Sequence, residues 1–183
     1  MDRENQGIIA KKYAKAFVDL FSNQSFQQDQ LAQDLDTIET FISYLHDHRK
    51  SLLFADLKLI PIKKRQDVFH NLIDTFGLKS VFTKLTDLLV IHQRIFMLHD
   101  VLKCIVRLYL DKVNVIPFTI FSSQNISASQ EDALIKFLEV KSNKTVIIKS
   151  QLDTTLIAGL KALSTDSEWE HSIRQKLSLL HQT

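Results

Sequence analysis

The stretch from Lys84 to Asp111 constrains the fold of this 183-residue chain more than any other segment. In its second half, apolar residues recur at steps of three and four, which places them on one face of an α-helix. They are Leu98, Val101, Leu102, Ile105, Leu108 and Tyr109. Residues 81–91 are apolar around most of the helix circumference. This predicts either a central position in a core or a second face buried against a partner.

Composition favours helices and excludes several classes of protein. Only three glycines and two prolines occur, which leaves few residues suited to the turns of a β-rich fold. The net charge is +2 with acids and bases interleaved, so there is no basic patch for nucleic acid. No apolar run approaches the ~20 residues needed to cross a bilayer, and the N-terminus does not resemble a secretory signal. We expect a cytosolic protein, or one held peripherally at a membrane through another protein.

The first predicted helix, residues 8–21, is apolar over more than half of its circumference. One face carries Ile9, Tyr13, Ala16 and Leu20, and an adjacent face carries Ala10, Ala14, Phe17 and Phe21. Two interpretations fit this pattern. The helix is either packed on two sides within its own domain, or it packs on the core with one side and on a partner helix with the other.

Further helices are predicted before and within the stretch from Lys84 to Asp111. Residues 27–46 carry a single apolar stripe, and residues 51–57 form a short helix with Ser51 as a candidate N-cap. Pro61 fits the first turn of the next helix, and Gly77 is placed to end it. Two more helices, separated near Gln93 and Arg94, complete a predicted six-helix bundle over residues 1–112.

The pattern changes to period two at Val113 and predicts a small α/β region over residues 113–183. Ile116, Phe118 and Ile120 alternate with other residues, and Pro117 suits an edge strand. Ser127 and Gln130 have the spacing of a capping box that opens a helix carrying Ala133, Leu134, Phe137 and Leu138. Two further strands are predicted over Thr145–Leu152 and Leu156–Leu163, followed by a helix over Ser172–Leu180. The predicted fold class is therefore mostly α, a six-helix bundle followed by a small α/β region.

A search for chemistry finds no catalytic apparatus. Among seven histidines, the pairs His46/His48 and His92/His99 lack further ligands at metal-binding spacing. No phosphate-binding glycine loop or nucleophile elbow is present, so we expect no metal, no cofactor and no enzymatic activity. Asp87 and Asp100 are interpreted as solvated surface charges, and Cys104 as a packing residue. The predicted helices carry more apolar surface than a single buried face requires, which indicates that the protein binds another protein.

Short motifs along nearly the whole chain resemble those of one family, in the same order. They are Lys12-Tyr13-Ala14-Lys15-Ala16-Phe17; Ile60-Pro61-Ile62 with Lys64; His92, Arg94 and Leu98 within residues 85–109; Ile126-Ser127 with Gln130; Lys144-Thr145-Val146; Asp153 with Leu156-Ile157-Ala158-Gly159-Leu160; and Ser172-Ile173-Arg174 with Leu177. Their order and spacing resemble the delta subunit of bacterial F-type ATP synthase, whose mitochondrial counterpart is the oligomycin-sensitivity-conferring protein.

The resemblance implies a non-catalytic subunit of the peripheral stalk, at the cytoplasmic face of the bacterial plasma membrane. In this family, N-terminal helices of the alpha subunits bind the bundle in grooves that involve the first and fifth helices. The C-terminal region, here residues 113–183, holds the C-terminal end of the b subunit. The residues expected to contact the alpha subunit are Ile9, Tyr13, Ala16, Phe17, Leu20, Leu85 and Leu89. Two alternatives remain: a helical adaptor that binds an amphipathic peptide outside an ATP synthase, and an enzyme with an unfamiliar site.

Overall fold

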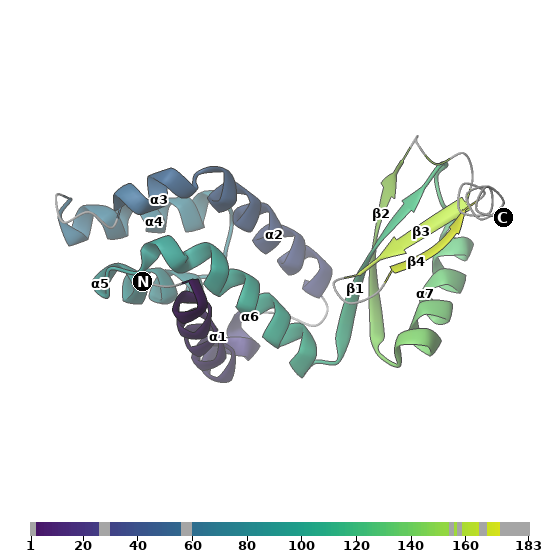
Figure 1. Cartoon of the computed structure of the whole chain (residues 1–183), viewed down its shortest axis with the longest axis horizontal. Helices are drawn as coiled ribbons and strands as arrows, with labels where there is room; N and C mark the ends of the chain where they lie inside the picture. Colours follow the sequence, from purple (N-terminus) through teal and green to yellow (C-terminus); the bar gives the residue numbers. More distant parts are fainter. Residues whose placement is uncertain are drawn as a thin grey trace. The chain divides into compact units, whose positions relative to one another are not determined.

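The chain divides into two compact units, Met1–Tyr109 and Leu110–Thr183. The structure is a computed structural model, and it describes residues 3–25, 30–55, 60–153, 156, 159–164 and 168–172. The first unit is built from helices and the second from a sheet with one described helix (Figure 1). The fold is thus mostly helical with a small sheet, as the sequence predicts.

The helices of the first unit follow one another through short connections. Their bounds are α1 (Arg3–Ser25), α2 (Leu31–Asp47), α3 (Arg49–Ala55), α4 (Ile62–Thr75), α5 (Val81–Ile91), the 3₁₀ turn η2 (Ile95–Met97) and α6 (Leu98–Lys112), whose last residues belong to the second unit. The predicted break near Gln93 and Arg94 is confirmed, because both residues lie between α5 and η2. Helix α1 extends beyond the predicted bounds at both ends.

Three local predictions about helix ends have different outcomes. Gly77 follows the C-cap of α4 with φ of +67°, in the left-handed region that glycine adopts without steric cost. The Leu78 N–H donates to the Ile73 carbonyl at 3.0 Å, which completes the motif that ends the helix. Ser51, by contrast, is not an N-cap: α3 begins two residues earlier at Arg49. Pro61 is the N-cap of α4 instead of lying inside its first turn.

Helix α5 lies at the centre of the first unit. It packs against α4, α1 and η2, and its residues Leu89 and Val90 are completely buried. Helix α2 contributes the buried Phe41, whose ring lies 5.1 Å from that of Phe76 at the end of α4. Burial within the unit, one of the two alternatives for residues 81–91, thus accounts for most of the apolar residues of α5, whereas Leu88 and Ile91 stay exposed.

The second unit is a four-stranded sheet with strand order β2-β1-β3-β4. Its strands are β1 (Val115–Ser122), β2 (Thr145–Leu152), β3 (Gly159–Leu163) and β4 (Glu168–Ser172). β1 runs parallel to β2 and antiparallel to β3, and β4 is antiparallel to β3. The crossover between the parallel strands is α7 (Ala128–Ser142), which covers one face of the sheet (Figure 1). The alternating Phe118 and Ile120 of β1 pack against Leu134 and Leu138 of α7, as their spacing predicts.

The capping box at the start of α7 is confirmed, and the bounds of β2 are those predicted. The Ser127 N–H donates to Oε1 of Gln130 at 2.9 Å. Pro117 is not on an edge strand, because β1 has neighbours on both sides. However, the described part of β3 pairs only with residues 119–122 of β1, so at Pro117 strand β1 pairs with β2 alone. Pro117 therefore does not have to donate a backbone hydrogen bond to a strand on its other side.

The end of the chain departs from the prediction. Ser172, expected to begin a helix, ends strand β4, which the sequence pattern did not reveal. The rest of the predicted helix lies outside the described residues. Strand β3 begins at Gly159, three residues after the predicted start at Leu156.

Candidate partner-binding surface

Helix α1 has a buried row of residues and a partly exposed row beside it. Ala10, Ala14 and Phe17 are buried against the unit. The neighbouring row, spaced four, three and four residues apart, consists of Ile9, Tyr13, Ala16 and Leu20. Ile9 and Tyr13 are half-buried, Ala16 is exposed, and 71% of Leu20 is exposed. We call this second row the flank row.

Three contacts hold α1 against α5 and the turn that follows it. The rings of Phe17 and Phe82 lie 5.2 Å apart. The ammonium of Lys84 lies 5.5 Å from the centre of the Phe21 ring. Nη1 of Arg94 donates to the Tyr13 hydroxyl at 3.1 Å, and the guanidinium lies over the Tyr13 ring. Because Arg94 orients a member of the flank row, the end of α5 lies beside that row.

Helix α5 presents different residues to solvent from those the sequence analysis selected. Leu85 and Leu89 are buried in the core of the unit, as is Phe17 of α1. The outward face of α5 instead carries Leu88 and Ile91, which are 43% and 56% exposed. Lys84 and Asp87 lie on the same face of α5 as Leu88 and Ile91, because these residues are three or four positions apart. The two charged residues are the sequence signal that marks this face as outward, and the sequence analysis did not use it.

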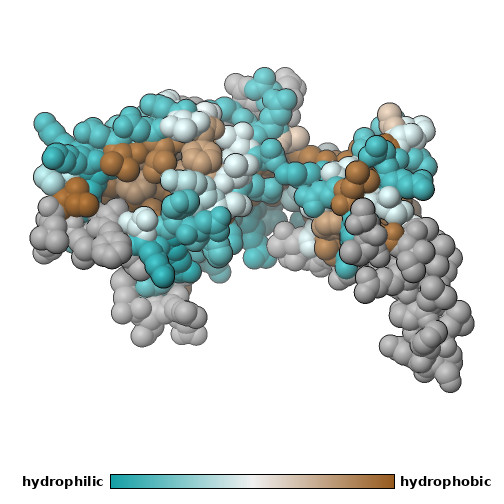
Figure 2. Space-filling view, turned by 90° about the horizontal axis from the view of Figure 1, so that it is seen from above, coloured by the Kyte–Doolittle hydropathy of each residue, from teal (hydrophilic) through white to brown (hydrophobic). Residues whose placement is uncertain are grey.

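The flank row together with Leu88 and Ile91 forms what we call the α1–α5 surface. Figure 2 looks onto the helical unit from above Figure 1, the side opposite to α1, and there too hydrophobic residues gather between hydrophilic areas. Leu20, Leu88 and Ile91 are among the exposed large hydrophobic residues of the described chain. Such a surface can bury the apolar stripe of another helix.

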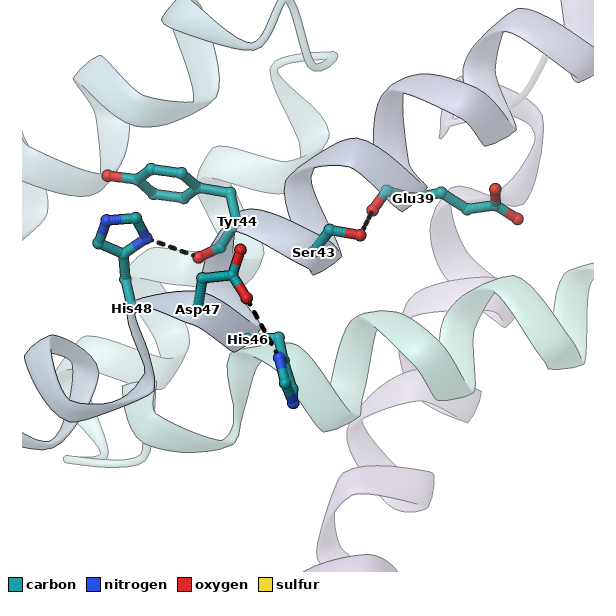
Figure 3. A network of polar contacts seen from close by, with 6 residues as sticks. All are labelled: Glu39, Ser43, Tyr44, His46, Asp47 and His48. Atoms are coloured by element: carbon teal, nitrogen blue, oxygen red, sulfur yellow. Dashed lines mark hydrogen bonds and ion pairs between the residues drawn. The ribbon is translucent and has the colours of Figure 1, made fainter.

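The histidines that invited a metal search have separate partners. Nδ1 of His48 contacts the Tyr44 carbonyl at 2.9 Å, whereas Nδ1 of His46 lies 3.4 Å from the Asp47 carboxylate (Figure 3). The two imidazoles therefore do not converge. Among the residues that the structure describes, no group of three or more His, Cys, Asp and Glu side chains could hold a metal ion.

Two carboxylates interpreted as solvated charges are in fact paired. Asp87 of α5 lies 2.8 Å from Nε2 of His70 on α4 and is only partly exposed. Asp100 lies 2.8 Å from Nδ1 of His99, a buried residue. The His70–Asp87 pair therefore joins α4 to α5, whereas His99 and Asp100 are neighbouring residues of α6.

Cys104 on α6 is half-buried and is not part of a disulfide. Burial raises the pKa of its thiol, and the nearby Lys11 of α1 opposes this rise. A raised pKa keeps the sulfur in its weakly nucleophilic thiol form, consistent with the packing role expected for it.

A depression of about 360 Å³ lies between the end of β1 and the start of α7. Its described lining residues are 122–126, 130, 159 and 160, and none of them carries a charge or an imidazole. General acid–base or nucleophilic catalysis needs such a group beside the reacting atoms. The described lining residues therefore supply neither a general acid or base nor an activated nucleophile.

No helix in the described ranges has the length and apolar content that a bilayer span requires.

Known proteins resemble the chain over nearly its whole length. ATP synthase subunit delta of Paracoccus denitrificans is 28% identical, over 94% of this chain and 89% of that protein. ATP synthase subunit delta of Chlorobaculum tepidum is 26% identical, over 96% and 94% of the two chains.

A solved structure shares the fold. A chain in the cryo-EM structure of the Toxoplasma gondii mitochondrial ATP synthase hexamer superposes with a TM-score of 0.58 at 17% identity, covering 94% of this chain and 95% of that one. The model of the ATP synthase delta (OSCP) subunit family matches residues 9–183. The chain therefore belongs to the ATP synthase delta (OSCP) subunit family.

Proposed function

We propose that this chain is a strut in the peripheral stalk of an F-type ATP synthase and binds N-terminal helices of the alpha subunits through its α1–α5 surface. Family membership makes it a non-catalytic subunit of that complex. The observation that carries the proposal is the partly exposed apolar flank row of α1, which ends in the 71% exposed Leu20, on a helix that packs against α5.

Within this proposal the seven residues expected to contact the alpha subunit take two roles. Ile9, Tyr13, Ala16 and Leu20 touch the incoming helix directly, joined by Leu88 and Ile91. Phe17, Leu85 and Leu89 are buried beneath that surface and hold α1 and α5 in register. The six helices α1–α6 act as one bundle that presents both helices to the partner.

The second unit attaches to the other end of the stalk. We infer that residues 113–183 bind the C-terminal end of the b subunit. The protein then connects the catalytic head to the stalk at the cytoplasmic face of the bacterial plasma membrane, which it reaches only through the complex. Held at both ends, it keeps the head from turning with the rotor, so that proton flow drives ATP synthesis.

A helix buried along an apolar surface suits this mechanical role. Burial of apolar area over several turns supplies binding energy along the whole contact, and differences in affinity between related complexes lie mostly in the dissociation rate. A slowly dissociating contact can resist the repeated load of rotation.

The test is calorimetric titration of the full chain with a peptide of about 20 residues, several helical turns, copied from the N-terminus of the same organism's alpha subunit. We expect saturable binding that Leu20→Asp weakens at least about tenfold, since a charge would enter the apolar contact.

The matched control is Val68→Asp, which places the same charge on an exposed apolar residue of α4, outside the α1–α5 surface. Leu20 and Val68 are both largely exposed, so neither variant should unfold the protein. Equal binding by wild type and Leu20→Asp would refute the α1–α5 assignment, and no binding by folded wild type would refute the alpha contact itself.

A further inference from the structure

Helix α7 carries an apolar stripe on the face that is turned away from the sheet. Leu134 and Leu138 face the sheet and are buried. On the opposite side, Ala133, Phe137 and Val140 follow one another at helical spacing, and Val140 is 84% exposed. We call these three residues the α7 stripe. It is separate from the α1–α5 surface, which belongs to the other unit.

The charges around the α7 stripe are distributed unevenly. Two of the acidic residues of α7 are bound to strand β2: Oε1 of Glu131 accepts from the Ser150 hydroxyl at 3.0 Å, and Oε1 of Glu139 accepts from the Val146 N–H at 3.3 Å. Lys136 and Lys141 are exposed on either side of Phe137 and Val140. The Lys141 ammonium lies 5.9 Å from the centre of the Phe137 ring.

Asp132 is the remaining acidic residue of α7, and it is exposed beside Ala133, at the narrow end of the stripe. The wider end, formed by Phe137 and Val140, is bordered only by lysines among the described residues of α7. An apolar ridge with a positive border complements an apolar ridge with a negative border.

We propose that the α7 stripe docks an amphipathic α-helix whose apolar residues are flanked by Asp or Glu. A helix is the fitting partner because side chains three and four residues apart form a ridge that packs between the ridges of another helix. The proposal rests on the proposed function, in which the second unit binds the C-terminal end of the b subunit, and it assigns that contact to one helix face.

Charge argues against two other occupants. A second copy of this chain packed stripe to stripe would bring Lys136 and Lys141 of both copies together, and such like-charge contacts oppose association. An anionic lipid surface would attract the lysines, but the stripe has only two large apolar side chains to insert, whereas interfacial helices bury a broad apolar face.

The test uses the full chain and a fluorescent peptide that copies the C-terminal segment of the same organism's b subunit, with affinity read by fluorescence anisotropy. We expect Val140→Asp to weaken binding at least about tenfold, because the exposed stripe would then carry an acid against an acidic partner. Lys136→Glu with Lys141→Glu should also weaken binding, and the loss should shrink as salt is added.

Matched controls separate the stripe from general effects of charge. Leu152→Asp changes a 62% exposed apolar residue on β2, and Lys63→Glu reverses an exposed lysine on α4. Both controls should bind the peptide within about twofold of wild type. Circular dichroism of each variant confirms that the helices are retained.

The outcomes separate this proposal from the proposed function. Peptide binding that Val140→Asp leaves unchanged would overturn the α7 stripe while the stalk role stands. Failure of the wild type to bind the b peptide, with alpha-peptide binding intact, would overturn the stripe and the b contact but leave the alpha contact. Dimerisation or binding to anionic vesicles that Val140→Asp abolishes, without peptide binding, would assign the stripe to another occupant and overturn the proposal.

Discussion

At the scale of single residues, adjacent leucines on α5 have different roles. Leu89 is completely buried, whereas Leu88 is 43% exposed. We expect Leu89→Ala to lower the free energy of unfolding by about 2–5 kcal/mol, because it removes buried methyl groups and leaves a cavity. Leu88→Ala should cost less than about 1 kcal/mol. Urea denaturation of both variants measures the difference, and equal losses would show that the two side chains are equally buried.

The thiol of Cys104 predicts a pH dependence of stability. Burial raises its pKa in the folded protein, whereas an unfolded chain has the ordinary cysteine value of about 8.5. Stability from the protonated thiol is therefore complete below the unfolded pKa and is lost as the pH rises toward the folded pKa.

Cys104→Ser should accordingly lose less stability than wild type as the pH rises above the unfolded cysteine pKa of about 8.5. The measurement is urea denaturation at several pH values across this rise. Some alkaline loss should remain in the variant, because burial also raises the pKa of Tyr109. Identical pH profiles for variant and wild type would mean that the thiol titrates alike in both states.

At the scale of elements, the end of α4 depends on one glycine. Gly77 has φ of +67°, and a Cβ added there would meet no atom within 4 Å. Any cost of Gly77→Ala therefore comes from backbone strain, which we expect to be about 1–2 kcal/mol. Thermal or urea unfolding measures it. Gly7→Ala is the control, since Gly7 lies within α1 with equal space around it and should tolerate alanine.

Element boundaries were predictable where local chemistry determines them. The glycine after α4, the capping box of α7 and the β-branched residues of β2 each act within a few neighbouring residues. Strand β4 was missed because Glu168–Ser172 lacks an alternating apolar pattern, and its strand conformation comes from pairing with β3. Ser51 can cap a helix, but α3 already begins at Arg49.

At the scale of the whole molecule, the two proposed attachments act in series. In the proposed role, torque on the catalytic head is transmitted through the α1–α5 surface and then through the second unit. Loss of either the alpha-subunit contact or the b-subunit contact is then enough to disconnect the head from the stalk. We expect Leu20→Asp and Val140→Asp each to lower proton-driven ATP synthesis in inverted membrane vesicles while ATP hydrolysis by the head continues. Combining them should add little.

Val68→Asp and Leu152→Asp serve as controls and should support synthesis like wild type. Full synthesis by a variant whose peptide binding is lost would show that the corresponding contact does not carry the load. ATP synthesis and hydrolysis are measured on the same vesicles, so that loss of coupling is distinguished from loss of the catalytic head.

The sequence by itself determined the helical character of the first unit, the βαβ order of the second and the absence of a recognisable catalytic motif. These follow from periodicity and local chemistry, which act over a few residues. Only the tertiary structure decided how far each apolar side chain is covered: Leu89 is completely buried, whereas Leu88 and Val140 are 43% and 84% exposed. An apolar residue has the same local pattern whether it faces its own fold or a partner, and only the packing of distant segments separates the two.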